Sequence, residues 1–190
     1  LGFGLDLFTP VLEDRDGDGA WSSNLMPPVD VRASLAGYIW ACMASPAGVL
    51  RWGGSHVVLG LAALRRNDVL GHVASLAAEQ SGGVFVDKRL PFYCLHALQW
   101  FLIAIARAAP EYPTALAPFA DKITDWALKD QPHVLIRQFA ARAGLALLDH
   151  GTLQDEDGLR DRLLKVNVSP HPVVDSKRFE RTRGKKRAAV

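Results

Sequence analysis

A short pattern that opens three segments of this chain limits the folds available to it. Each copy begins with an apolar residue and an arginine, and continues with small and apolar residues at helical spacing. The copies start at Val31, Leu50 and Ile136, and a fourth segment, from Leu95, has His96 in place of the arginine. A recurring helix start of this kind predicts stacked helices, because a helix with two apolar sides cannot bury both alone.

Hydrophobic periodicity and helix-breaking residues divide the chain into about seven helices. No segment alternates polar and apolar residues for long enough to predict a strand. The expected fold is therefore all-α, an irregular α-solenoid of stacked antiparallel helix pairs. The predicted helices cover residues 31–44, 47–66, 69–80, 90–109, 114–129, 132–148 and 155–166.

Three regions of the chain differ in composition. Residues 1–27 form an irregular N-terminal segment, residues 28–166 a helical-repeat domain, and residues 167–190 a disordered basic tail. Between Lys177 and Val190 the tail holds seven basic residues and one acid, so the rest of the chain carries a formal −4 within the overall +2. A mildly acidic body is not typical of a folded surface built for nucleic acid.

The spacing of the pattern resembles that of HEAT and armadillo repeats. Arg32, Arg51, His96 and Arg137 are separated by intervals of 19, 45 and 41 residues. The two longer intervals match the repeat period of about 40–47 residues, whereas the first implies two consecutive helices. The resemblance implies helix pairs joined by short turns and a surface used for protein–protein interaction.

Two segments, Leu50–Val57 and Pro132–Arg137, also look like helical-repeat regions of large bacterial multidomain proteins, some of which carry a STAND-type NTPase module. This resemblance implies a non-catalytic scaffold or sensor module, a C-terminal fragment of a larger bacterial protein. The chain begins with Leu1 rather than Met, which is expected of a fragment. The implied partner is another protein or another domain of the same polypeptide. A cytoplasmic location is expected separately, because no signal peptide and no membrane span are recognisable in the sequence.

The basic tail supports an alternative function, that of a nucleic-acid-associated helical protein binding weakly and without sequence specificity. A solvated tail without a partner accounts for the same residues. Truncation after Ser176 separates the two, because unchanged affinity for DNA or RNA at low salt would exclude the alternative. No membrane contact is expected, since the most apolar run, residues 97–106, is shorter than the roughly 20 residues of a membrane span.

An acidic loop carries the sharpest local motif in the sequence. Its carboxylates alternate, and a glycine falls at position six, as in an EF-hand-type loop. Position twelve is Leu25, where a bidentate glutamate is required. A solvated turn, a Ca²⁺-stiffened loop and a hydrolase motif similar to that of haloacid dehalogenase phosphatases therefore stay open. The carboxylates are Asp14, Asp16 and Asp18.

The other reactive side chains are dispersed. The six histidines form no HxxxH or Cys/His cluster, which favours core or capping roles for them. Cys42 and Cys94 are expected to be buried thiols, and the tryptophans within helices to pack in the core or in a groove. We therefore expect no catalytic residue, no cofactor-binding residue and no metal ligand, and no enzyme activity.

Two expectations concern individual side chains. The arginines of the pattern lie near helix N-termini, where the helix dipole disfavours a cation, so we expect each to pair with a neighbouring aspartate or glutamate. The helix over residues 132–148 has one apolar face, which predicts a buried Phe139 whose removal costs about 3–5 kcal/mol. The other members of that face are Ile136, Ala140, Ala143 and Leu147.

Overall fold

The computed structural model describes residues 26–86, 92–129, 132–169 and 171, and every regular element in this part of the chain is helical. The all-α prediction is confirmed over these residues. The longer helices are α2 (Val31–Ala44), α3 (Gly48–Ala63), α4 (Asn67–Glu79), α5 (Phe92–Ala108), α7 (Ala120–Leu128), α8 (Val134–Asp149) and α9 (Leu159–Leu164). Short helical turns are η4 (Gly83–Phe85), α6 (Pro113–Leu116), η5 (Ala117–Phe119) and η6 (Glu156–Gly158).

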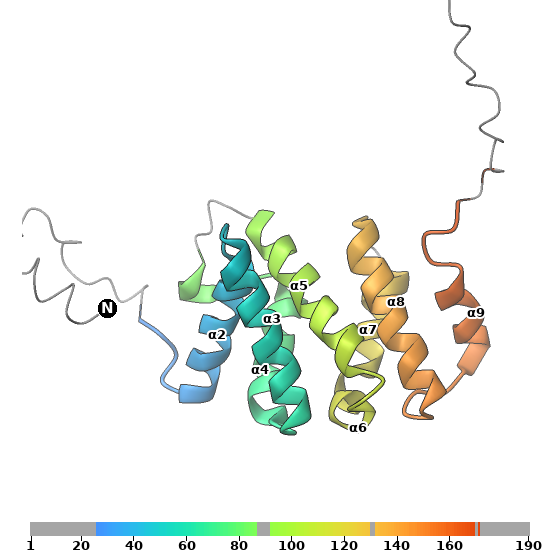
Figure 1. The fold of residues 1–190 in the computed structure, drawn as a ribbon, viewed down its shortest axis with the longest axis horizontal. Helices are drawn as coiled ribbons and strands as arrows, with labels where there is room; N and C mark the ends of the chain where they lie inside the picture. Colours follow the sequence, from blue (N-terminus) through green and yellow to red (C-terminus); the bar gives the residue numbers. More distant parts are fainter. Residues whose placement is uncertain (1–25, 87–91, 130–131, 170, 172–190) are drawn as a thin grey trace, which may run out of the picture.

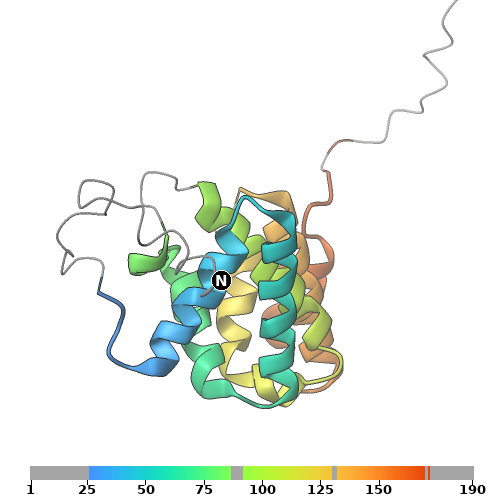
Figure 2. The same ribbon diagram turned by 60° about the vertical axis from the view of Figure 1, so that its left-hand side comes forward.

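The helices follow the longest axis of the molecule roughly in chain order, from α2, α3 and α4 to α8 and α9 (Figure 1). Helices α3, α5 and α8 lie side by side, since α3 packs against α5 and α5 against α8. Helix α2 packs against α3, α4 and α5, and α7 packs against α8. The turned view shows α2 and α3 as neighbours at the N-terminal end of this arrangement (Figure 2).

Large side chains from successive helices form one continuous core. Trp40 of α2 is fully buried, and Phe101 of α5 is 1% exposed. The Phe101 ring meets Trp126 of α7 edge-on, with centroids 6.0 Å apart, and so joins α5 to α7. Burial of this apolar area is the main source of stability for such a helical stack.

The single helix predicted over residues 114–129 is divided in the structure. The turn η5 separates α6 from α7, and Pro118 lies within it. Proline lacks the N–H that a continuous helix needs and its ring clashes with the preceding turn, so the uninterrupted helix is a wrong prediction. The helix predicted over residues 155–166 is likewise shorter, with η6 preceding α9.

Helix α3 contains two adjacent glycines, Gly53 and Gly54, and one of them allows α2 to approach closely. A Cβ on Gly54 would lie 2.8 Å from Met43 Cγ and 3.2 Å from the carbonyl oxygen of Ile39, both in α2. A Cβ on Gly53 would meet nothing within 4 Å. The close crossing of α2 and α3 is therefore at Gly54 and not at Gly53.

Alanine at these two neighbouring positions should change stability in opposite directions. Gly53→Ala should raise the free energy of unfolding by about 0.5–1 kcal/mol, because alanine loses less backbone entropy in a helix. Gly54→Ala should lower it by about 1 kcal/mol or more, since Met43 and the α2 backbone must shift. Urea unfolding followed by circular dichroism measures both, and shifts of the same sign would contradict the assigned crossing.

Candidate interaction surface

Two arginines of the recurring pattern bind backbone carbonyls at the end of the preceding helix or just beyond it. Arg51 Nη1 donates to the carbonyl oxygens of Ser45 and Pro46 at 2.7 and 2.8 Å. Arg137 Nε donates to the carbonyl oxygen of Ala127 at 3.3 Å. The C-terminal end of a helix attracts a cation, which explains an arginine in the first turn of the next, antiparallel helix. The expected carboxylate partners are therefore wrong for these two residues.

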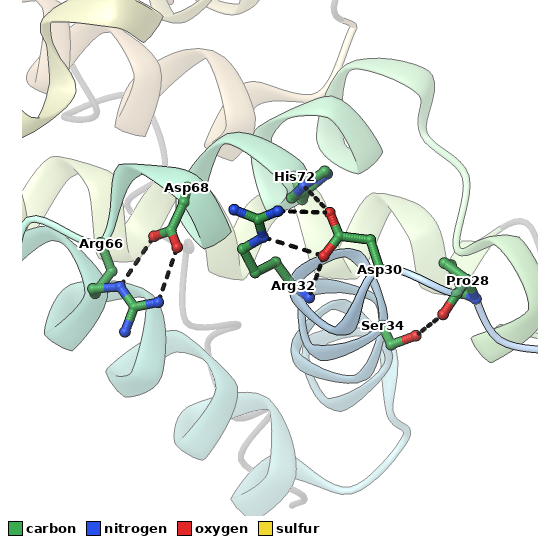
Figure 3. A network of polar contacts seen from close by, with 7 residues as sticks. All are labelled: Pro28, Asp30, Arg32, Ser34, Arg66, Asp68 and His72. Atoms are coloured by element: carbon green, nitrogen blue, oxygen red, sulfur yellow. Dashed lines mark hydrogen bonds and ion pairs between the residues drawn. The ribbon is translucent and has the colours of Figure 1, made fainter.

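Arg32 is the copy that does pair with a carboxylate, in an exposed network at the starts of α2 and α4 (Figure 3). Its Nε lies 3.1 Å from Asp30 Oδ1, which also accepts the Arg32 backbone N–H and so caps α2. A second ion pair joins Arg66 and Asp68, with Arg66 Nη2 2.9 Å from Asp68 Oδ2. His72 Nε2 lies 3.7 Å from Asp30 Oδ2. The arginine hydrogen bonds lower the pKa of Asp30, and that of Asp68 to about 2.

His96, the fourth copy, is half-buried in α5. Burial lowers the pKa of its imidazole, with further lowering by Arg51 and His133, which favours the neutral ring. Its ring centroid lies 4.4 Å from that of Phe92. His133 instead caps α8, its Nδ1 accepting the Ile136 N–H at 3.4 Å, which confirms a capping role for that residue.

An aromatic and cationic cluster bridges α3 and α5. The Trp52 ring lies edge-on to His56 and to Trp100, with centroid distances of 4.5 and 6.1 Å. The Arg107 guanidinium lies over the Trp52 ring at 5.7 Å, and that of Arg51 over the Trp100 ring at 5.9 Å. Trp52 is nevertheless 50% exposed. The contacts hold a large aromatic side chain in place at the surface.

Core packing is confirmed for two of the helical tryptophans, Trp40 and Trp126, whereas Trp52 is half exposed and packs beside Trp100 of α5. The sequence does contain a signal for the exposed site. Trp52 and His56 lie one turn apart, and α3 has no acidic residue in its sixteen positions. What the sequence lacks is the position of α5, which supplies Trp100 and Arg107.

The three helices α3, α5 and α8 also differ in formal charge from α2, α4 and α7. Helices α3, α5 and α8 together carry four arginines and one aspartate, a formal +3. Helices α2, α4 and α7 carry four acids and two cations, a formal −2. The single aspartate of the first set, Asp149, is paired with Arg160 at 2.8 Å.

Exposed apolar side chains flank the cluster. Val49, one turn before Trp52, is 82% exposed, and Phe92, one turn before His96, is 60% exposed. We refer to the combined area as the α3–α5 surface. It comprises Val49, Arg51, Trp52 and His56 of α3, and Phe92, His96, Trp100 and Arg107 of α5. Its mixture of aromatic, apolar and arginine side chains is that of an interface core.

Two mainly apolar hollows lie beside α2. One, of about 420 Å³, includes Tyr38, Cys42 and Tyr93 in its walls, and the other, of about 370 Å³, includes His72 and Glu79. Within the described residues, neither they nor any other place gathers three His, Cys, Asp or Glu side chains able to hold a metal.

The two cysteines are half-buried rather than buried as expected, and burial raises the pKa of the Cys94 thiol. Asp14, Asp16 and Asp18 and the basic residues of the tail, from Lys177 onward, lie outside the described residues, so the Ca²⁺ and nucleic-acid hypotheses stay predictions.

None of the described helices is both long and apolar enough to cross a membrane. No protein-family model, curated protein or solved structure matches the chain.

Proposed function

We propose that this chain is a non-catalytic α-helical repeat module, a scaffold or sensor surface for protein–protein interaction. The observation that carries the proposal is the half-exposed Trp52, fixed by His56, Trp100 and Arg107. Tryptophan and arginine are the residues most enriched at the energetic centre of protein interfaces. A side chain already held in its conformation loses little entropy when a partner covers it.

A repeated arrangement of helix pairs supports a HEAT-like solenoid as the architecture of this module. Arg51, His96 and Arg137 occupy the fourth or fifth position of α3, α5 and α8, the three helices that lie side by side. In the pair α7–α8 the arginine binds a carbonyl group in the last turn of the first helix, and in the pair α2–α3 it binds two carbonyl groups directly after the first helix. Each of the three helices then corresponds to the second helix of a repeat, and such rows form the extended surfaces that repeat proteins use for binding.

Site-specific photo-crosslinking in the native host tests the proposed function. The benzophenone amino acid p-benzoylphenylalanine would replace Val49, which is exposed one turn from Trp52, and in a matched control it would replace Ala78, exposed on α4. We expect a discrete protein adduct from position 49 alone, and its loss when Trp52→Ala is added. Equal adducts from both positions, or adducts indifferent to Trp52→Ala, would contradict the proposal.

A further inference from the structure

We infer that the α3–α5 surface binds an acidic peptide segment that also carries apolar side chains. The inference rests on the proposed function and names the chemistry of the partner. Carboxylates of the peptide would meet Arg107 and the positive field of α3, α5 and α8, while an apolar side chain packs on Trp52 between Val49 and Phe92.

Charge is the first argument for an acidic partner. Helices α3 and α5 contain no aspartate or glutamate, and both Arg51 and Arg107 lie over indole rings. Across the described part of the chain, neither arginine is paired with a carboxylate. Arg51 already donates to the Ser45 and Pro46 carbonyl oxygens, whereas Arg107, stacked on the Trp52 ring, keeps the N–H groups in the plane of its guanidinium available for bidentate bonding to a carboxylate. Arg107 is exposed, so a partner can reach it.

The apolar component is the second argument. Val49, Trp52 and Phe92 are all at least half exposed, and Gly53 beside Trp52 has open space around it. A position without a side chain lets a partner backbone approach α3 closely. A purely acidic segment would leave these apolar surfaces in water, so a segment that alternates acidic and apolar residues complements the surface better.

The ring geometry disfavours single-stranded nucleic acid, the other polyanion that binds arginine and tryptophan together. Such nucleic acids stack successive bases on open aromatic faces. Here an arginine covers a face of Trp52 and another covers a face of Trp100, while the two indoles meet edge-on at 87°. The cluster therefore does not offer two parallel open faces on which successive bases could stack. The net charge of its helices is also modest for binding a polyanion.

Fluorescence anisotropy with the full-length chain tests the inference. The probe is a labelled peptide of about 15 residues, the length of a bound helix or strand segment, with glutamate at alternate positions and leucine or phenylalanine between them. We expect saturable binding that weakens about tenfold with Arg107→Gln and at least tenfold with Trp52→Ala, as for central interface residues. Arg142→Gln, which removes an exposed arginine of α8, should change the Kd by less than about twofold.

Comparison probes decide which feature of the peptide is recognised. A peptide with glutamine in place of glutamate, and a polyglutamate peptide of equal length, should both bind at least tenfold more weakly. Equal binding of the glutamine peptide would overturn the inference, as would tighter binding of an oligo-dT strand that is weakened by Trp52→Ala. The basic tail is the same in every variant, so differences among variants report on the surface. The crosslinking experiment and the peptide experiment can also disagree. If position 49 still gives a Trp52-dependent adduct but the acidic peptide does not bind, the acidic partner is rejected and the proposed interaction function is not.

Discussion

Replacing Phe101 by alanine should lower the free energy of unfolding by about 3–5 kcal/mol, the range for removal of a buried aromatic side chain. The ring is 1% exposed in the middle of α5 and meets Trp126 edge-on. Its loss would remove apolar contacts between α5 and α7 and leave a cavity that a helix held by neighbours on several sides cannot close. Urea unfolding followed by circular dichroism at 222 nm, a helix-sensitive wavelength, measures the loss.

Phe139→Ala is the matched control for this prediction. Phe139, a residue of α8, packs against the hydrophobic core of the molecule but is only partly buried. This corrects the expectation that it lies on the inner face of the helix. We therefore expect a loss of about 1–2 kcal/mol, in proportion to the smaller apolar area removed from water. Equal losses for the two variants would mean that Phe101 and Phe139 are buried to the same extent, against the packing described above.

The sequence predicts those features of the fold that local interactions decide. Asp30 caps α2 and His133 caps α8 within three residues of the N–H groups they accept, so their roles can be read from a short window. Ile136, Ala140, Ala143 and Leu147 are buried as their spacing predicts. Phe139 lies three residues from Ile136, at the edge of the same face, and periodicity alone does not separate the edge from the centre.

Features decided by contacts between helices were mispredicted or missed. The first-turn arginines looked unfavourable because the sequence does not show that the end of the preceding helix is adjacent. The sequence does not separate the half-exposed Trp52 from the core tryptophans, because its exposure depends on how α3 packs against α2 and α5, a tertiary property. The α3–α5 surface joins residues of two helices separated by α4, so no local pattern contains it.

Arg51→Met should lower the free energy of unfolding by about 2 kcal/mol, because two hydrogen bonds from a charged donor to the Ser45 and Pro46 carbonyls are lost. Methionine keeps an unbranched apolar chain against Trp100, so the comparison isolates the guanidinium. Arg32→Met is the matched control from the same pattern. Its pair with Asp30 is exposed and is screened by salt, so we expect an unfolding midpoint close to that of the unmodified chain.

Salt dependence separates the two arginines further. The partners of Arg51 are neutral carbonyl groups, so the loss caused by Arg51→Met should persist in 1 M NaCl, where the Debye length is about 3 Å. A loss that disappears in salt would show that Arg51 acts as a charge on the surface instead of as a cap on α2.

Arg107 makes no hydrogen bond to a helix end among the described residues, so Arg107→Gln should weaken acidic-peptide binding and leave the unfolding midpoint unchanged. If both results are obtained, Arg51 serves the fold and Arg107 serves the proposed recognition.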